Sequence, residues 1–289
     1  DLIGWTRVFF GMKRSSWLHS LSKRVTLNDV PKKFILSGPS GFLGKRVLKS
    51  IIDFQHFRRE HGLEPGELVL LSASPGNLMN RLSKQYPESM SSIRASRVDY
   101  FAQHEVDMWI DHLGSLGLGG KDCVFINLAA TAGPVDGVPE AMESTNYHAP
   151  IAAAKACKEL NFGHFIQSST QATNIERAGQ VPYSRWKAMC DHALVRLSDQ
   201  SYSDITNGIG NIVFPVSIAR FGLLYCRIEK MLGQGRDDKV NIKNRRGTYG
   251  GTSINLSDLS LLPLTPIMGN GSAPLQPLEV VDAARRLTY

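Results

Sequence analysis

The stretch FILSGPSGFLGKRVL, residues 34–48, decides how this 289-residue chain is expected to fold. Its first four residues form a short apolar run typical of a buried strand. A turn with glycines at 38, 41 and 44 follows, and the residues after it begin a helix with apolar side chains on one face. The stretch therefore predicts a strand, a glycine turn and a helix in direct succession.

Strand-like and helix-like segments continue to alternate along the chain. The segments expected as strands are 34–37, 67–72, 95–99, 123–129, 164–168 and 211–216. Expected helices span 42–61, 139–161 and 183–199, with a further helical segment at 103–116. This alternation predicts an α/β fold, a Rossmann-type doubly wound parallel sheet with right-handed crossovers.

Charge and cysteine content narrow the function classes. The formal net charge is +7, but residues 1–33 hold seven Lys/Arg against Asp1 and Asp29, so the rest of the chain is almost neutral. A nucleic-acid-binding face on the domain is therefore not expected. The four cysteines contain no CxxC pair, and the histidines lack metal-ligand spacing. We predict buried thiols in a reducing compartment and no metal site.

The first 32 residues form a basic amphipathic arm that mixes Trp5, Phe9 and Trp17 with arginines and lysines. This composition suits a membrane surface or a large assembly, and an extended arm packed on its own domain is the alternative. No apolar run is long enough to span a bilayer. A start at Asp1 is compatible with a removed mitochondrial transit peptide.

The glycine turn has the pattern Gly38-x-x-Gly41-x-x-Gly44 between a strand and a helix. Gly38 can adopt positive φ, Gly41 allows backbone N–H groups to approach a pyrophosphate, and Gly44 allows close helix packing. The following helix presents unpaired donors and a partial positive charge to phosphates. The turn predicts a dinucleotide site, and a tight turn without ligand is the alternative.

The end of the second strand bears on which dinucleotide binds. Ser72, Ala73 and Ser74 supply no carboxylate for the adenosine ribose, so NADP is favoured over NAD, with Ser74 as a phosphate donor. Arg81 and Lys84 either assist or lie on a solvated helix face. The carboxylate that follows the third strand, Asp99, either meets the adenine or caps a turn.

Tyr183 and Lys187 lie four residues apart at the start of a predicted helix and hence on one face. A nearby ammonium lowers the pKa of a tyrosine from about 10, so that the phenol can exchange a proton with a hydroxyl or carbonyl. The pair is therefore a candidate acid/base site.

Taken together, these motifs resemble the extended and atypical short-chain dehydrogenase/reductases from about residue 33 to the end of the chain. The matching motifs are the turn from Gly38 to Gly44, NLAA at 127–130, Asn146, SST at 168–170, Tyr183 with Lys187, FPVSIARFG at 214–222 and QPLEVVDAARRL at 276–287.

The resemblance implies a tyrosine acid/base, a lysine that binds the nicotinamide ribose, and a Ser or Thr that orients substrate. By position these are Tyr183, Lys187 and Thr170, with Ser169 as the neighbouring candidate. The cofactor-binding residues it implies are Gly38, Ser40, Gly41, Phe42, Leu43, Gly44, Ser74, Asp99, Leu128, Ala129, Ala130, Asn146, Ser168, Tyr183, Lys187 and Pro215. The expected domains are the arm at 1–32, an NAD(P)-binding Rossmann domain at 33–232, and a loop-rich insertion with a closing helix at 233–289.

Three departures distinguish this chain from sugar-nucleotide epimerases. Only 12 residues separate Thr170 from Tyr183, little sequence remains for a C-terminal substrate lobe, and the segment 233–273 interrupts the region where that lobe begins. With these features the chain most resembles the dehydrogenase-fold accessory subunits of mitochondrial complex I (NADH:ubiquinone oxidoreductase).

That resemblance implies a noncatalytic subunit on the matrix side of the mitochondrial inner membrane, with other subunits of the respiratory complex as partners. It also implies a tightly bound NADPH with a structural or redox-sensing role, and peripheral membrane contact through the arm. One alternative is an active NADP-dependent oxidoreductase or epimerase that uses Tyr183, Lys187 and Thr170. Another is an interaction protein that binds no nucleotide.

Overall fold

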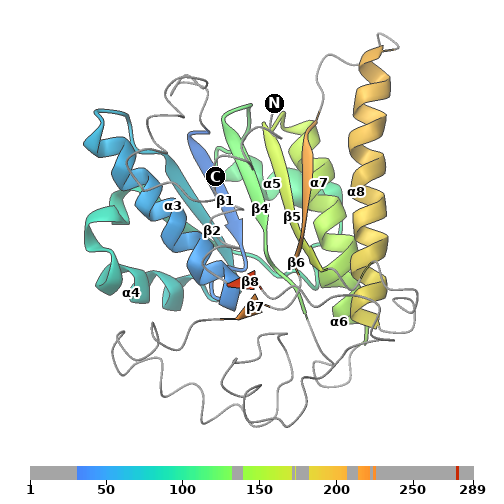
Figure 1. Ribbon diagram of the computed structural model, residues 1–289, viewed down its shortest axis with the longest axis horizontal. Coiled ribbons are helices and arrows are strands. Elements are labelled where there is room, and N and C mark those ends of the chain that lie inside the picture. The colour runs from blue at the N-terminus through green and yellow to red at the C-terminus, as the bar shows by residue number, and fades with distance from the viewer. Residues whose placement is uncertain are drawn as a thin grey trace.

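A six-stranded parallel sheet forms the centre of the computed structural model, which describes residues 31–131, 139–170, 173, 182–206, 214–221, 224–225 and 278–279. The strand order is β3-β2-β1-β4-β5-β6, so the order reverses between β1 and β4 (Figure 1). The strands are β1 (Lys33–Ser37), β2 (Glu67–Ser72), β3 (Ile93–Arg97), β4 (Cys123–Asn127), β5 (His164–Thr170) and β6 (Val216–Phe221). Two short strands, β7 (Leu224–Tyr225) and β8 (Leu278–Glu279), pair separately. The predicted doubly wound sheet is confirmed.

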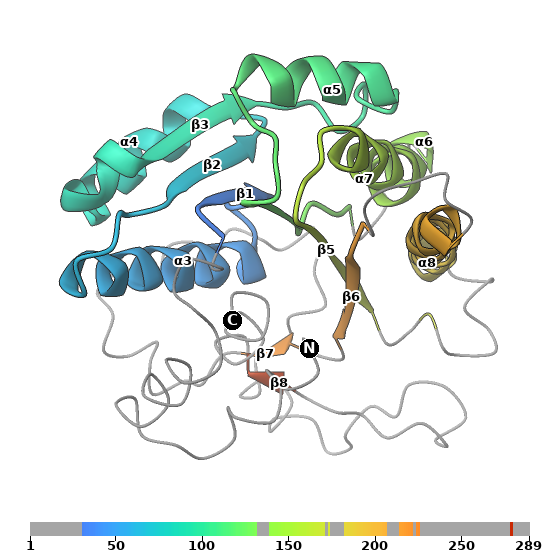
Figure 2. The same ribbon diagram turned by 90° about the horizontal axis from the view of Figure 1, so that it is seen from above.

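Helices cover both faces of the sheet, and Figure 2 shows α3 on the side opposite α5 and α7. The helices are α3 (Phe42–Glu60), α4 (Pro75–Gln85), α5 (Val106–Ser115), α6 (Pro139–Glu143), α7 (Ala149–Glu159) and α8 (Pro182–Thr206), with a 3-10 turn η2 (Pro87–Ser92) and a π-helical turn η3 (Ser144–His148). One core cluster packs α3 and α4 on the sheet, and the other packs α5, α7 and α8. Both faces of the strands are therefore buried, as the near-continuous apolar sequences of β1, β2 and β4 require.

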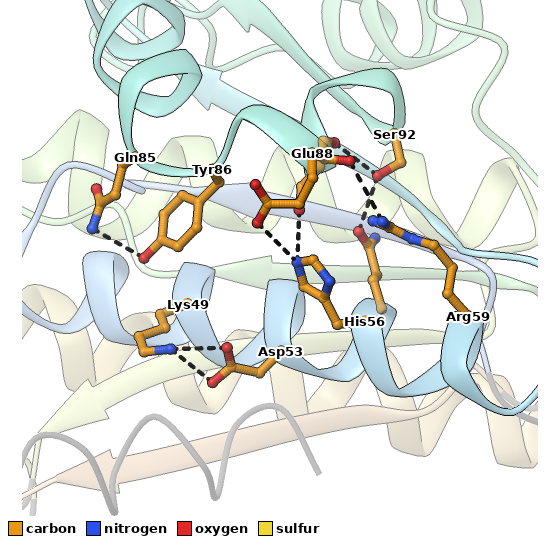
Figure 3. A network of polar contacts seen from close by, with 10 residues as sticks. Lys49, Asp53, His56, Arg59, Gln85, Tyr86, Glu88 and Ser92 are labelled. Carbon is orange, nitrogen blue, oxygen red and sulfur yellow. Dashed lines mark hydrogen bonds and ion pairs between the residues drawn. The ribbon is translucent and has the colours of Figure 1, made fainter.

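Polar contacts with η2 brace the C-terminal half of α3 (Figure 3). His56 Nε2 lies 2.9 Å from Ser89 Oγ and 3.5 Å from Glu88 Oε1, and Arg59 Nη1 donates to the Glu88 carbonyl at 3.4 Å. On the exposed side, Lys49 pairs with Asp53 at 2.8 Å. These contacts hold the helix at the end away from the glycine turn.

The differences from the prediction that bear on the candidate site lie in two strands and one helix. Elsewhere β4 ends at Asn127 instead of 129, β5 continues to Thr170, α8 continues to Thr206, and α4 and η2 were not among the expected elements. β3 begins and ends two residues earlier than 95–99, because the chain turns at Asp99, whose Oδ1 accepts the Phe101 N–H at 3.0 Å. The last strand of the sheet starts at Val216 rather than at 211. The helix predicted over 139–161 contains the π-helical turn η3 just before Pro150, a residue that has no N–H for a regular helical hydrogen bond.

Several predictions fall outside the described residues: the basic arm through residue 30, the connection at 171–181 apart from residue 173, the insertion at 233–273 and the reduced C-terminal lobe. The closing helix expected near 276–287 is described only at Leu278–Glu279, and there the prediction was wrong, because these residues form strand β8 and pair with β7. No helix in the part of the chain that the structure describes combines the length and apolarity needed to cross a bilayer.

Candidate nucleotide site

The three glycines of the turn after β1 meet different surroundings. Gly38 has φ +67°, and a Cβ there would lie 2.9 Å from the Ala129 nitrogen. A Cβ on Gly44 would overlap the Gly38 carbonyl. Gly41 differs, because its backbone is extended (φ −67°, ψ 170°) and a Cβ there would approach one atom of the described residues, the Gly38 oxygen, in a tight contact of 3.3 Å. The fold itself therefore requires glycine at 38 and 44, whereas the described residues leave room for a ligand beside Gly41.

The N-terminus of α3 begins at this open position. Gly41 is the N-cap, no side chain caps the helix, and its first turn has no acidic residue. Since Lys45 N–H makes the bond to the Gly41 carbonyl at 3.0 Å, the amides of Phe42, Leu43 and Gly44 precede the intrahelical bonds. Ser40 and Gly41 are exposed, and Phe42 is 39% exposed. The turn can therefore hold phosphate oxygens on backbone N–H groups.

The carboxyl end of β2 lies beside this turn and has no acidic side chain from Ser72 to Ser74. Ser72 Oγ accepts the Ser74 N–H at 3.2 Å, and the Ser74 side chain is exposed. At about 1.5 Å per residue, Arg81 lies about 9 Å and Lys84 about 13 Å along α4 from its start at Pro75. Lys84 is in the last turn of the helix, which makes it unsuitable for a ligand at the carboxyl end of the sheet.

Arg97 is a cation at this end of the sheet that sequence reasoning missed. It is exposed, ends β3 and is the Cα partner of Ser72 in the sheet register. No partner for its guanidinium occurs among the described residues. The prediction that placed the strand at 95–99 put Arg97 mid-strand, and only the observed strand end brings it to the carboxyl end of the sheet.

Asp99 acts as a turn cap in this structure. Its Oδ1 accepts the Phe101 N–H, and its own carbonyl accepts the Gln103 N–H at 2.9 Å. The capping alternative therefore describes Asp99 here.

The loop after β4 is held in place by two buried side chains. Leu128 and Ala129 donate their N–H groups to Ser37 Oγ at 3.0 and 3.2 Å. Asn146, fully buried in η3, accepts the Thr131 N–H at 3.2 Å and donates to the Thr131 carbonyl at 2.7 Å. Both ends of the Asn146 amide are thus engaged by protein, so Asn146 positions the loop that carries Ala130 rather than presenting a free amide to a ligand.

Lys187 reaches the end of β5 from the first turns of α8. Its side chain is 1% exposed, and Nζ donates to the Ser168 carbonyl at 3.1 Å, the one acceptor it has among the described residues. An ammonium carries three donors, so two of them have no acceptor in the described ranges and can serve a ligand. Thr170 and Tyr183 are half-buried at the same end of the sheet.

Ser169 faces the opposite way from a substrate-orienting residue. It is buried, and its Oγ donates at 2.9 Å to Asp191 Oδ2, which also accepts from Arg220 Nε at 2.8 Å. Successive strand residues point to opposite faces, so Thr170 is left as the candidate on β5.

The surroundings of Tyr183 disfavour ionisation of its hydroxyl group. Burial, and secondarily the negative charge of Asp191, raise the pKa of Tyr183. Burial also lowers the pKa of Lys187, and the neighbouring Cys190 and Asp191 side chains oppose this shift. The tyrosine is therefore stabilised as a neutral phenol.

Pro215 does not join the other candidates. It precedes β6, and its carbonyl accepts the N–H of Phe165, near the start of β5. In a parallel sheet this position is the amino end, across the sheet from the ligand side. The prediction for Pro215 was wrong because it placed the last strand at 211–216, with Pro215 near its carboxyl end.

A surface groove on α8 lies apart from the candidate site. A shallow groove of about 310 Å³ is lined by Met189, His192, Ala193 and Arg196. At 100° per residue this stripe lies on the face of α8 opposite Lys187, so the groove is separate from the candidate site. Within the described ranges, no three His, Cys, Asp or Glu side chains gather as metal ligands.

Comparisons with known proteins support the fold. No protein-family model and no curated protein sequence matches the chain. Pen from Bacillus thuringiensis is a structural match with TM-score 0.54 and 14% identity, over 89% of this chain and 64% of that one. A short-chain dehydrogenase from Streptomyces avermitilis matches with TM-score 0.53 and 15% identity, over 88% and 81%. Pal from Bacillus thuringiensis matches with TM-score 0.53 and 17% identity, over 88% and 72%.

At these identities the likeness shows the fold, which is of the Rossmann-like short-chain dehydrogenase type. The chain spans less than two thirds of the length of Pen.

Proposed function

We propose that this protein binds NADP(H) along the carboxyl end of its sheet as a structural cofactor and does not turn it over. The observation that carries the proposal is the room that the described residues leave beside Gly41, next to the first amides of α3, which have no partner in the described part of the chain. The residues present fit the nucleotide: the turn from Gly38 to Gly44 would hold the pyrophosphate, and Lys187 would hold the nicotinamide ribose through its two remaining donors. The bound nucleotide would supply a hydride if the site were catalytic.

The preference for NADP over NAD rests on the end of β2. A carboxylate there would repel a 2′-phosphate and accept bonds from ribose hydroxyls, but residues 72–74 contain none. Ser74 can donate to the phosphate, and the exposed guanidinium of Arg97 adds a positive charge beside it.

The absence of turnover rests on Tyr183. An acid/base tyrosine needs a pKa near the working pH, whereas burial and Asp191 raise that of Tyr183. The size of a structural contribution follows from linkage, because a ligand present at 100 times its dissociation constant adds about 2.7 kcal/mol to folding stability.

Tyr183→Phe separates this proposal from its alternative, an active oxidoreductase or epimerase. The substitution removes only a neutral hydroxyl, so we expect the NADPH dissociation constant to change less than about fivefold, which corresponds to about 1 kcal/mol. Neither the parent nor the variant should oxidise NADPH steadily with small carbonyl substrates. If the parent oxidises NADPH steadily and Tyr183→Phe abolishes this activity, the protein is an active oxidoreductase and the proposal of a structural nucleotide is wrong.

We further propose that the protein is an accessory subunit of mitochondrial complex I, on the matrix side of the inner membrane. Support comes from the resemblance of the motifs and from the basic aromatic arm, which suits a large assembly or a membrane surface. The native protein should migrate with NADH:ubiquinone oxidoreductase activity on a native gel. Migration as a free 31.9 kDa chain would contradict this assignment.

A further inference from the structure

A row of three polar side chains crosses the middle of the sheet at the carboxyl ends of its strands. Ser37, Asn127 and Gln167 are Cα partners on β1, β4 and β5, and none is more than 1% exposed. Two residues earlier in each strand, the equivalent row is Ile35, Phe125 and Phe165, all fully buried. The core thus changes from apolar to polar within one repeat of the strand, next to the candidate site.

The row forms one chain of hydrogen bonds that runs in a single direction. Ser37 Oγ donates to Asn127 Oδ1, and Asn127 Nδ2 donates to Gln167 Oε1 at 2.8 Å. Gln167 Nε2 then donates to the Ser168 carbonyl at 2.8 Å. Burying such groups without partners is costly, but here each donor has an acceptor, so the row is tolerated and rigid.

Both ends of the row reach parts of the candidate site. At one end Ser37 Oγ accepts the N–H groups of Leu128 and Ala129, which fixes the loop after β4. At the other end the Ser168 carbonyl accepts from Gln167 and also from Lys187 Nζ. Sheet stability alone does not call for a glutamine here, since the flanking partner of Ser37 is Leu71 and that of Gln167 is Ile218.

We infer that Gln167 is a positioning residue for the nicotinamide side of the nucleotide, because it fixes the Ser168 carbonyl that holds the Lys187 ammonium. The inference rests on the proposed function, since it concerns how the same site grips NADP(H). Gln167 should not affect binding of the adenosine side, which lies at the ends of β2 and β3. A purely structural glutamine would affect stability and leave the balance between the two sides of the nucleotide unchanged.

The test compares NADPH with 2′,5′-ADP, a fragment that contains only the adenosine side. Gln167→Met keeps the side-chain length and removes both hydrogen bonds. We expect the NADPH dissociation constant to rise ~10-fold and that of 2′,5′-ADP to change less than ~2-fold. The matched control is Gln55→Met. Gln55 lies on α3 away from the site, is equally buried, and donates to the Gly66 carbonyl at 2.8 Å. The control should lower the melting temperature without changing the ratio of the two constants.

The outcomes separate the inference from the proposed function. If Gln167→Met leaves the ratio of the two dissociation constants as in the parent, the inference is overturned while NADP(H) binding stands. If the parent binds neither NADPH nor 2′,5′-ADP, the proposed function fails and the inference with it.

Should Gln167→Met not fold, the parent protein answers the same question by NMR. The assigned side-chain amide resonance of Gln167 should shift on addition of NADPH and stay in place with 2′,5′-ADP, because only NADPH engages Lys187. If the chemical shift of this amide changes with neither compound, or changes equally with both, the inference is overturned.

Discussion

Gly41→Val is expected to weaken NADPH binding at least ~100-fold, about 2.8 kcal/mol, while the protein remains folded. The branched side chain would occupy the space above the turn and keep phosphate oxygens away from the amides that open α3. The protein is expected to fold after a shift of a few tenths of an ångström, because the backbone at 41 is extended and a Cβ makes one tight contact with the described residues, 3.3 Å from the Gly38 oxygen. Calorimetry would give both the dissociation constant and the melting temperature.

The matched control for this variant is Gly114→Val on α5. Gly114 is exposed, and a Cβ there would meet nothing within 4 Å, so the same substitution should leave NADPH affinity as in the parent. If Gly41→Val folds and binds NADPH as tightly as Gly114→Val does, the phosphate cradle described here does not exist.

Lys187→Met is expected to weaken NADPH binding ~10-fold or more, while the melting temperature of the nucleotide-free protein stays the same or rises. Burying an ammonium against a single carbonyl is unfavourable, and methionine fills a similar volume without a charge. Asp191 keeps its bonds to Arg220 and Ser169 in the variant. Lys49→Met is the control, because that exposed lysine on α3 pairs with Asp53 at 2.8 Å, an exposed ion pair of small expected energy.

NADPH affinity is also expected to depend on pH through Lys187. Burial lowers the pKa of Lys187, so its charged form is lost as the pH rises through that lowered value. NADPH affinity, measured by fluorescence titration, should therefore fall with rising pH in the parent and lose this dependence in Lys187→Met. A variant that loses stability but keeps both its affinity and its pH profile would show that Lys187 is structural only.

The order of elements was predictable because its signals are local. A strand, a glycine turn and a helix follow one another within residues 34–48, and the same alternation recurs along the chain. The ligand side of the sheet follows from this order alone, because parallel strands place their carboxyl ends together. The turn from Gly38 to Gly44, the loop at 128–130 and the end of β5 lie at the carboxyl end of the sheet for this reason.

Features that depend on pairing between strands were not predictable. The apolar run at 211–216 is as strand-like as VSIARF at 216–221, and only pairing with β5 places the strand at the second, which is why Pro215 was assigned to the wrong end of the sheet. The position of Arg97 at the carboxyl end of the sheet follows only from its register with Ser72. The polar row of Ser37, Asn127 and Gln167 likewise exists only across three strands that are distant in sequence.

The most direct test of the central claim is to identify the nucleotide released when washed native protein is denatured. Mass spectrometry should find NADPH or NADP⁺ at close to one molecule per chain, since a structural cofactor survives washing. Release of no nucleotide, or of NAD(H) in its place, would contradict the account.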